Sequence, residues 1–342
     1  MKKVLIISSP FFDYQKSVGF AFESLGYEVR IETYDEPIHP FKGLLKWRHK
    51  FSSRKEELRA VSRAKYDLYI KQVYDSYMPD IVFSYNGTIL LDERLDYFRK
   101  KSKVIFWMYD SVQRPDRERC KLHIDHADAV FCFEENDVEF YRNIGKTAYF
   151  LPLACDTSIY YPIDIEEKEI DILFVATIYT SQKRIRLLQQ VVNQFIDAKI
   201  VIYGWYKPFV KNPIQWLLRG KRSIYKNRNI PPSEVNSLFS RTKIALNIHH
   251  EQTFHGANQR LFEACGAGVY QICDANPYIE SLFPNGEVGL YHNEQELIEC
   301  IKWALDPANR TERERRAKAA QQIILQGHTF KDRVSEMLKM IE

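Results

Sequence analysis

The residues with the clearest chemical potential lie in one stretch of the carboxyl half of the chain. An apolar run ends in the polar residues 247–251, which include His249, and a loop with His255 and Gly256 follows before a helical pattern begins near Ala257. The free N–H groups of a helix amino terminus and the helix dipole both favour negative charge. This arrangement therefore predicts a site for a diphosphate.

Three side chains of the predicted helix have chemistry that suits such a ligand. Asn258 would present an amide and Arg260 a guanidinium, and Glu263, one turn further on, could accept both hydroxyls of a ribose. The alternative is that Arg260 and Glu263 form an ordinary i, i+3 ion pair on a helix surface, worth a few tenths of a kcal/mol. These residues alone leave both interpretations open.

The elements that must position these residues follow a regular alternation. Short apolar runs alternate with helical patterns, which is typical of parallel sheets covered on both faces. In the amino half the apolar runs are continuous, so both faces of each strand should be buried. The strands expected there span residues 4–8, 29–33, 81–85, 104–109, 129–133 and 148–153, and the helices span 16–25, 41–77 and 136–142.

A break at residues 151–169, with two prolines and a charged run, indicates a domain linker. Beyond it the strands expected are 170–176, 199–203, 243–248 and 269–273, and the helices are 182–195, 233–240, 257–266, 294–305, 311–326 and 331–341. We therefore predict an α/β fold of two Rossmann-like, doubly wound parallel-sheet domains facing a cleft, at residues 1–155 and 156–327, with residues 328–342 returning to the first domain. Ligands of such sheets bind outside the carboxyl ends of the strands.

Composition and missing motifs exclude several classes of protein. The 342 residues include 45% hydrophobic and 27% charged residues with a net charge of +4, which is typical of a globular protein and does not suggest a nucleic-acid partner. No G-x-G-x-x-G follows the first strand, and no Walker A, H-E-x-x-H or D-x-D pattern occurs, so we expect no cofactor and no metal. The six scattered cysteines and the lack of any run of roughly 18 apolar residues favour a cytoplasmic location without a membrane span.

Several motifs in their order and spacing resemble a known family. They are N-x-R-x-x-E-x-x-x-x-G at residues 258–268, Asp274, residues 285–287 and Tyr291, together with residues 107–110, 127–133, 149–156 and 171–177 and Arg184. Over most of residues 80 to 335 the chain resembles the CgeB-like (spore maturation protein type) glycosyltransferases. The resemblance implies a GT-B fold, a nucleotide-sugar donor in the carboxyl domain, an acceptor in the amino domain and no metal.

The resemblance also implies roles for individual residues. Glu263 would bind the donor ribose, and Asn258 and Arg260 the phosphates. Arg184, with Lys183 as the alternative, would neutralise the leaving diphosphate.

Further positions of the donor site follow from the same resemblance. Gly204 and Tyr225 occupy loops where related enzymes hold the nucleotide base. Many retaining GT-B enzymes carry E-x7-E, but the residue eight before Glu263 is His255, which leaves the stereochemistry of transfer open.

An inverting transfer needs a general base within hydrogen-bond reach of the acceptor hydroxyl. Asp110 follows an apolar strand and is our first candidate, although it could instead cap the next helix. Asp13 in the first loop and His39 are the other candidates.

Two basic segments interleaved with aromatic residues, 41–55 and 207–228, could each be a solvated surface or a contact with an anionic membrane. We therefore expect a cytoplasmic enzyme, and under the second interpretation it is peripheral to the inner face of the membrane.

The function expected is metal-independent transfer of a sugar from a nucleotide-sugar donor to a glycan, lipid-linked glycan or protein acceptor, as in polysaccharide biosynthesis. The alternatives are a nucleotide-sugar epimerase of the same fold and a non-catalytic binding or scaffold protein.

Overall fold

The computed structural model describes residues 1–34, 55–114, 123–178, 181–206 and 223–341. The chain divides into two compact units: unit 1 is formed by residues 1–151 and 330–342, and unit 2 by residues 152–329. The basic segment 41–55 except its last residue, residues 207–222 of the second basic segment, and His39 lie outside the described residues.

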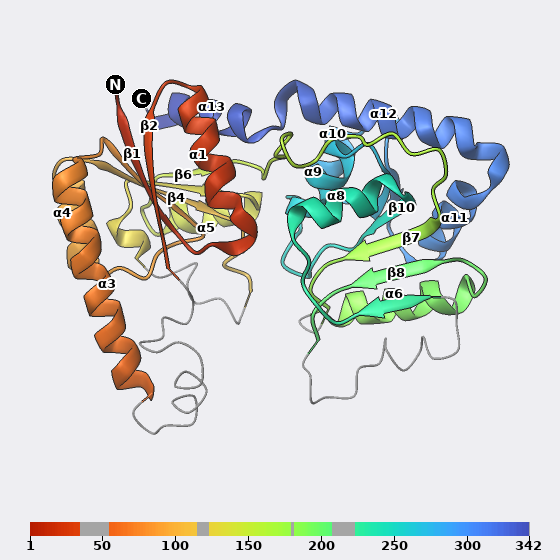
Figure 1. Cartoon of the computed structure of the whole chain (residues 1–342), viewed down its shortest axis with the longest axis horizontal. Helices are drawn as coiled ribbons and strands as arrows, with labels where there is room; N and C mark the ends of the chain where they lie inside the picture. The colour runs from red at the N-terminus through yellow and green to blue at the C-terminus, as the bar shows by residue number, and fades with distance from the viewer. Residues whose placement is uncertain (35–54, 115–122, 179–180, 207–222, 342) are drawn as a thin grey trace. The chain divides into compact units, whose positions relative to one another are not determined.

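Unit 1 is built on a six-stranded parallel sheet with the order β2-β1-β3-β4-β5-β6 (Figure 1). The strands are β1 (Lys3–Ser8), β2 (Glu28–Thr33), β3 (Ile81–Tyr85), β4 (Lys103–Met108), β5 (Ala129–Cys132) and β6 (Ala148–Phe150). Every residue of β3 and all but the first of β4 are buried, which explains their uninterrupted apolar runs. The order reverses between β1 and β3, which places the topological switch point there.

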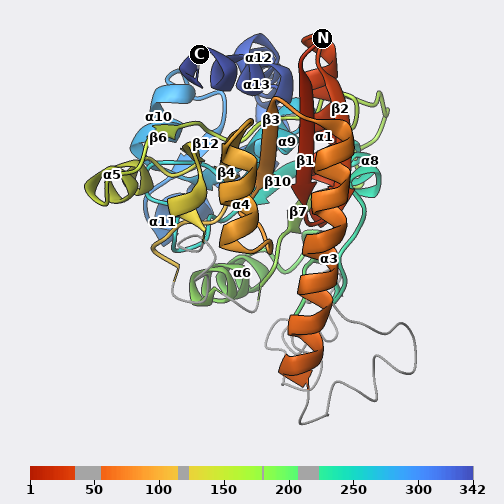
Figure 2. The same cartoon turned by 90° about the vertical axis from the view of Figure 1, so that its left-hand side faces the viewer.

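The helices of unit 1 pack on both faces of its sheet. They are α1 (Tyr14–Ser24), α3 (Lys55–Tyr77), α4 (Asp92–Arg99), α5 (Glu135–Asn143) and α13 (Phe330–Ile341), with 3₁₀ turns η1 (Phe11–Asp13) and η3 (Ile124–His126). Figure 2 shows α3 beside α4, and the two helices are in contact. Although α13 comes last in the chain, it packs against α1.

An aromatic cluster attaches α13 to unit 1. The ring of Phe330, the first residue of α13, stacks on Tyr14 with centroids 6.4 Å apart and meets Trp107 edge-on at 5.9 Å. Both Phe330 and Trp107 are buried. Trp107 also donates its indole N–H to the carbonyl of Leu151 at 3.1 Å, so the same ring fixes the last residues of the first segment.

Unit 2 contains a second six-stranded parallel sheet with the order β12-β11-β10-β7-β8-β9. The strands are β7 (Ile170–Val175), β8 (Ile200–Tyr203), β9 (Ile224–Lys226), β10 (Thr242–Asn247), β11 (Tyr270–Asp274) and β12 (Gly289–Tyr291). Numbered along the chain from β7, this is the 3-2-1-4-5-6 order of dinucleotide-binding sheets, with its switch point between β7 and β10.

The helices of unit 2 bury apolar side chains against this sheet. They are α6 (Gln182–Gln194), α8 (Pro232–Ser240), α9 (Gln259–Gly266), α10 (Pro277–Leu282), α11 (Glu294–Leu305) and α12 (Arg310–Gly327), with the 3₁₀ turn η4 (Pro307–Asn309). Asparagine side chains cap three of them, at Asn258, Asn276 and Asn293, where each Oδ1 accepts a backbone N–H of the first turn.

The expected α/β fold of two doubly wound parallel sheets is confirmed. The strand expected at 148–153 is shorter, because residues 151–153 have left the ladder. Four short elements were not expected: α4, α10, β12 and β9, the last of which places Tyr225 in a strand and not in a loop. Each has between three and eight residues, so each shows too little periodicity to stand out in the sequence.

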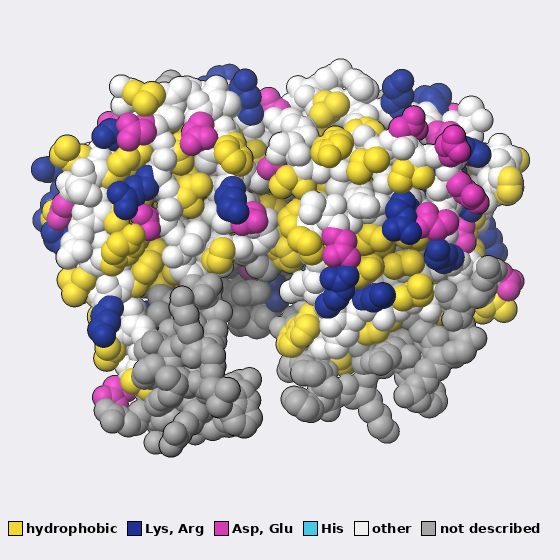
Figure 3. Space-filling model, in the orientation of Figure 1, with side chains coloured by type: hydrophobic (Ala, Val, Ile, Leu, Met, Phe, Trp, Pro, Cys, Tyr) yellow, Lys and Arg dark blue, Asp and Glu magenta, His cyan; other side chains and the backbone are white. Residues whose placement is uncertain are grey.

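The surfaces of both units carry charges of both signs. Figure 3 shows Lys and Arg side chains interspersed with Asp and Glu on the face that it presents. Within the part of the chain that the structure describes, no helix is long and apolar enough to cross a membrane.

Removing the aromatic anchor of α13 should destabilise unit 1. We expect Phe330→Ala to lower the free energy of unfolding by about 3–5 kcal/mol, because it empties a buried site between Tyr14 and Trp107. Urea unfolding followed by circular dichroism measures this change. Phe20→Ala is the matched control, since Phe20 on α1 is 62% exposed and its loss should cost no more than about 0.5 kcal/mol. Equal effects of the two variants would contradict the anchor.

Candidate functional site

The switch point of unit 2 brings several predicted residues together. At this edge β7 and β10 lie side by side, and the chain leaves them in loops that lead to α6 and α9. In open α/β sheets, ligands bind in the crevice outside the carboxyl ends of the strands at such a point. Lys183, Arg184 and His249 all follow these strand ends.

Arg184 connects the ends of the two central strands. Its Nε donates to the carbonyl of Ile248 at 2.8 Å, and its Nη1 donates to the carbonyl of Thr177 at 2.8 Å. Its backbone N–H donates to the Ser181 hydroxyl, which caps α6. Arg184 is buried, so in this structure its guanidinium holds the loops after β7 and β10 in place. Its predicted contact with a leaving diphosphate stays a prediction.

A charged cluster is centred on the carboxylate of Asp274, the last residue of β11. Its Oδ2 lies 2.5 Å from Lys183 Nζ, and its Oδ1 lies 2.8 Å from Nδ1 and 2.9 Å from the backbone N of His249. Burial alone would raise the pKa of Asp274, but the charge and hydrogen bonds of His249, together with Lys183, hold that pKa well below its usual range. The carboxylate is therefore ionised and orients the side chains of Lys183 and His249.

His249 keeps one ring nitrogen for a ligand. Its side chain is buried, and Asp274 engages Nδ1. The second ring nitrogen, Nε2, is buried and has no hydrogen-bond partner among the described residues. Buried polar atoms are nearly always hydrogen-bonded in proteins, so such an atom indicates a missing partner. A phosphate oxygen or a sugar hydroxyl would fit it.

A pocket of about 360 Å³ adjoins this cluster in unit 2. Its lining includes Lys183, Asp274, Asn276 and the ring of Phe254, which is 50% exposed. Asn276 caps α10 with Oδ1 and donates through Nδ2 to the carbonyl of Gly256 at 2.9 Å, so it fixes the loop before α9. The pocket thus combines a cation, hydrogen-bonding groups and an exposed aromatic face, which is the usual lining of a small-molecule site.

Asn258 holds the start of α9. The helix begins at Gln259, not at Ala257 as expected, and Asn258 is its cap. The amide that we expected to face a phosphate donates to Asn247 Oδ1 at 2.7 Å and accepts from Asn247 Nδ2 at 3.0 Å. In this structure the side chain of Asn258 therefore joins β10 to α9.

Arg260 and Glu263 form the ion pair that the sequence left open, but inside the protein. Arg260 Nη1 lies 2.5 Å from Glu263 Oε2, and the side chain of Glu263 has no exposed surface. The guanidinium also lies over the ring of Phe239, 5.8 Å from its centroid. The phenol of Tyr160 adjoins this pair, and burial, followed by the charge of Glu263, raises its pKa. The role of Glu263 at a donor ribose stays a prediction.

Gly204, Tyr225 and His255 are the remaining predicted donor residues. A Cβ on Gly204 would lie 2.1 Å from the carbonyl oxygen of Ala176, so only glycine fits where β8 ends beside β7. Tyr225 donates its hydroxyl to the carbonyl of Gly204 at 2.7 Å, which joins β9 to the same point. His255 is half-buried in the loop before α9.

Unit 1 has its own polar cluster at the carboxyl ends of its strands. Asp110, two residues beyond β4, accepts from Asn86 Nδ2 at 3.1 Å and pairs with Arg114 Nη1 at 3.0 Å. Asn86 Oδ1 in turn accepts the backbone N–H of Asp110 at 3.1 Å. Asn86 has a φ of 66°, an uncommon conformation for a residue other than glycine that clusters at functional sites. These contacts fix the orientation of the Asp110 side chain, which is buried.

Asp13 lies at the same edge of the sheet, after β1. It pairs with Lys16 at 3.1 Å, and its side chain is about half exposed, at 49%. Its contacts are local to the start of α1, which gives less support for a base than the cluster around Asp110.

Asp137 is a buried acid that sequence reasoning missed. It accepts from the Ser111 hydroxyl at 2.8 Å and from the backbone N–H of Val112 at 3.2 Å. Burial raises its pKa to about 7, against the effect of these hydrogen bonds. Acidic residues are common in the first turn of a helix, so the sequence offered no signal that this one is buried beside Ser111.

Among the residues that the structure describes, no group of three or more His, Cys, Asp or Glu side chains is arranged to hold a metal ion.

Asp274→Asn should destabilise the protein at neutral pH by about 3–5 kcal/mol, because it removes the buried carboxylate that pairs with Lys183 and accepts hydrogen bonds from His249. The folded-state pKa of Asp274 lies below its ordinary value of 3.8, so its contribution is complete above that value and is lost as the pH falls through the folded-state pKa. In urea unfolding, the difference in free energy of unfolding between wild type and variant should become smaller below about pH 4. Glu234→Gln, which removes an exposed pair with Arg228, should cost no more than about 1 kcal/mol. A gap independent of pH would refute this assignment.

Asp137→Asn should have the opposite pH dependence. In the folded protein Asp137 keeps a proton that the unfolded chain loses between about pH 4 and pH 7, so its contribution to stability falls as the pH rises through that window. As the pH rises through this window, the free energy of unfolding of the variant should therefore rise relative to that of the wild type by up to about 1.4 kcal/mol per pH unit. Urea midpoints at pH 4.5, 5.5 and 6.5 test this, and parallel curves for the two proteins would rule it out.

Part of unit 2 and most of the helix α13 match a family of known proteins. Residues 183–339 match the family model described as glycosyl transferase-like. No curated protein matches the chain.

Solved structures match over the whole length. Sucrose-phosphate synthase from Thermosynechococcus elongatus is 12% identical with a TM-score of 0.71, over 99% of this chain and 98% of that one. A glycosyltransferase from Rickettsia africae is 9% identical with a TM-score of 0.66, over 99% and 97%. Anabaena HepE, in complex with UDP-glucose, is 11% identical with a TM-score of 0.66, over 99% and 100%. The chain therefore has the GT-B fold, with a glycosyl transferase-like region at residues 183–339; its narrower resemblance to the CgeB-like family stays a prediction.

Proposed function

We propose that this protein is a glycosyltransferase that moves a sugar from a nucleotide-sugar donor to a hydroxyl group of a glycan, lipid-linked glycan or protein. The observation that carries the proposal is the cluster of Lys183, His249 and Asp274 at the carboxyl edge of unit 2. It lies beside a pocket of suitable size, on a GT-B fold, within the region that matches the glycosyl transferase-like model.

The proposed reaction breaks the bond between the anomeric carbon of the sugar and the diphosphate while the acceptor oxygen forms a new one. The leaving nucleoside diphosphate gains negative charge, which cationic groups and helix dipoles stabilise. Lys183 in the first turn of α6 supplies a cation there, and His249 Nε2 supplies a hydrogen-bonding group. We propose that these groups take the place of a metal ion.

The proton of the acceptor hydroxyl needs a base, and Asp110 is the residue that we propose for it. Asn86 and Arg114 both engage its carboxylate, so its orientation is fixed before the acceptor binds. Asp13 is the secondary candidate. Unit 1 would accordingly bind the acceptor and unit 2 the donor.

The remaining donor contacts of the proposal come from the resemblance. Gly204 and Tyr225 would hold the base, and Arg260 and Glu263 the phosphate and ribose. Because Glu263 is fully buried against Arg260, ribose binding there requires the ion pair to open. Cytoplasmic location, contact of the basic segments with a membrane and a role in polysaccharide biosynthesis belong to the same proposal.

A second candidate function is a nucleotide-sugar epimerase. A putative UDP-N-acetylglucosamine 2-epimerase from Listeria monocytogenes is 16% identical to this chain with a TM-score of 0.62, over 100% of this chain and 96% of that one. An epimerase would convert its nucleotide sugar without any acceptor, whereas a transferase releases nucleoside diphosphate in step with glycosylated acceptor.

The first experiment is a thermal-shift panel with UDP, GDP, dTDP, CDP and CMP, each in Mg²⁺ and in EDTA. A nucleotide at 100 times its dissociation constant should stabilise the protein by about 2.7 kcal/mol. We expect one diphosphate to stabilise equally in both buffers. Stabilisation only with Mg²⁺ would overturn the metal-independent mechanism, and no response to any nucleotide would favour a scaffold protein.

Lys183→Met tests the placement of the phosphates. The side chain of Lys183 is 32% exposed, so the variant should fold, and the loss of its charge should weaken binding of the active diphosphate at least tenfold. Lys302→Met is the matched control, since Lys302 is an exposed lysine of α11 outside the pocket. Isothermal titration calorimetry measures both affinities, and unchanged binding to Lys183→Met would remove the phosphates from this cluster.

A further inference from the structure

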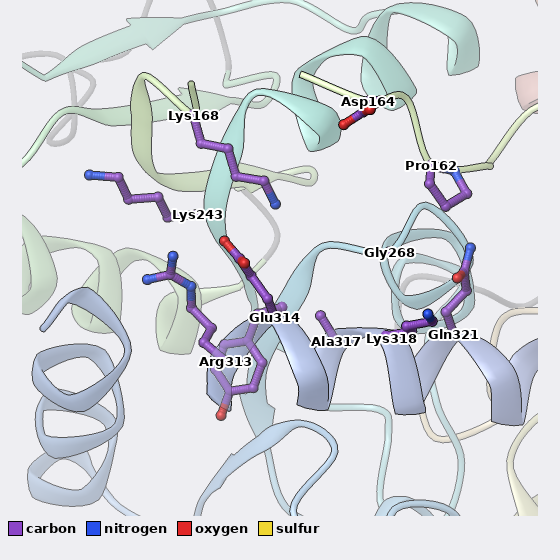
Figure 4. Close-up of a pocket in the computed structure, with 11 residues that line it drawn as sticks. Pro162, Asp164, Lys168, Lys243, Gly268, Arg313, Glu314, Ala317, Lys318 and Gln321 are labelled. Atoms are coloured by element: carbon purple, nitrogen blue, oxygen red, sulfur yellow. The ribbon is translucent and has the colours of Figure 1, made fainter. Parts of the chain in front are cut away.

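A second pocket lies at the opposite edge of the unit 2 sheet. It has a volume of about 450 Å³, and its lining includes Lys168 just before β7, Lys243 in β10 and Tyr270 at the start of β11 (Figure 4). Because these strands are parallel, the amino ends that form this pocket are remote from the carboxyl ends that carry His249 and Asp274. The other wall of the pocket is α12.

Positive charge dominates the lining of this pocket. Four cations line it, Lys168, Lys243, Arg313 and Lys318, against two carboxylates, Asp164 and Glu314. Lys243 pairs with Asp171 at 2.7 Å, and Glu314 pairs with Arg310 at 3.0 Å; neither Asp171 nor Arg310 is part of the lining. The lining therefore keeps an excess of positive charge, although Glu314 offsets part of it.

Two of these cations, Lys168 and Arg313, lie close together, and the carboxylate nearest to both is that of Glu314, which also pairs with Arg310. Arg313 is buried on α12, and its Nη1 donates to the carbonyl of Ala304. Lys168 has no ion pair or hydrogen bond from its ammonium group to any of the described residues. Figure 4 shows Lys168, Arg313 and Glu314 converging on the same space. Burial, followed by the charge of Arg313, lowers the pKa of Lys168, and burial also lowers that of Arg313; the charge of Glu314 acts against both shifts.

Cations that are partly buried and repel one another destabilise a protein unless an anion joins them. Charge-assisted hydrogen bonds from arginine and lysine are the usual means of binding phosphate. The volume of the pocket also lies within the range of small-molecule sites, about 300–1,000 Å³, and exceeds what one phosphate ion fills.

We propose that Lys168, Arg313 and Lys318 form a binding site for the phosphoryl group of a small molecule, separate from the donor site. The phosphoryl oxygens bridge Lys168 and Arg313, and the rest of the ligand lies along α12 toward Lys318. Glu314 opposes the anion and weakens its binding.

Inorganic phosphate and glucose 6-phosphate are the probes, each added to the full chain by thermal shift at an ionic strength matched with chloride. We expect saturable stabilisation by at least one of them. Tighter binding of the sugar phosphate would assign the site to a phosphorylated metabolite, and equal or tighter binding of inorganic phosphate would assign it to the free ion. No saturable stabilisation beyond that of chloride would overturn the proposal.

Three variants assign the binding to this pocket. Lys168→Met and Lys318→Met should each weaken phosphate binding, by at least tenfold for Lys168, whereas Glu314→Gln should strengthen it several-fold because it removes the opposing carboxylate. Lys318 and Glu314 are both exposed, so their variants should fold. Lys65→Met, at an exposed lysine of α3 in unit 1, is the control and should bind as the wild type does. Phosphate affinity that is the same in all these proteins would overturn the proposal.

Two further readouts separate this site from the donor site. Without phosphate, Lys168→Met should melt at a higher temperature than the wild type, because it removes the repulsion from Arg313. The same variant should keep the wild-type response to the nucleotide that binds the donor site. Loss of the nucleotide response together with the phosphate response would mean that phosphate binds at the donor site, which would overturn a separate pocket.

Discussion

The buried carboxylate of Asp274 is the group on which the carboxyl edge of unit 2 depends. An ionised carboxylate away from water is costly unless charges and hydrogen bonds surround it. His249 and Lys183 meet that requirement from two different elements, the loop after β10 and the first turn of α6. One buried charge therefore fixes both elements relative to the end of β11. In the proposed reaction, the diphosphate of the donor would meet Lys183 and His249 already in position, so little reorganisation would be needed.

Unit 1 reaches a similar rigidity by a different route. The side-chain amide of Asn86, in the loop after β3, donates a hydrogen bond to the carboxylate of Asp110 and accepts one from its backbone N–H. Burial raises the pKa of the neighbouring Asp137 carboxyl to about 7, whereas His249 and Lys183 hold the pKa of Asp274 well below its usual range. Both edges thus hold a buried carboxylate that pairs with a basic side chain, Asp110 with Arg114 in unit 1 and Asp274 with Lys183 in unit 2.

Sequence patterns were sufficient for the larger elements. Continuous apolar runs predicted β1, β3, β4, β7 and β10 within one residue at each end, because strands buried on both faces leave no other pattern. The partners of the site residues were not predictable. Glu263 is buried beside Arg260 and Tyr160, and Asp137 is buried beside Ser111. Tyr160 and Ser111 are distant in sequence from these carboxylates, so local sequence patterns do not reveal the contacts. Asn258 is a similar case, since an amide that caps a helix and one that faces a phosphate occupy the same position in a sequence.

The division of the chain has a consequence for how the protein is made. Unit 2 is one continuous segment, residues 152–329, whereas unit 1 needs α13 from the end of the chain. During synthesis on the ribosome, residues 1–151 emerge first but lack the helix whose Phe330, Val334 and Met337 are buried against them. The apolar face of α1 is therefore left open until α13 has left the ribosome, although domains that emerge first usually fold first. The segment that forms unit 2 precedes α13, so unit 2 can complete its core before unit 1 does.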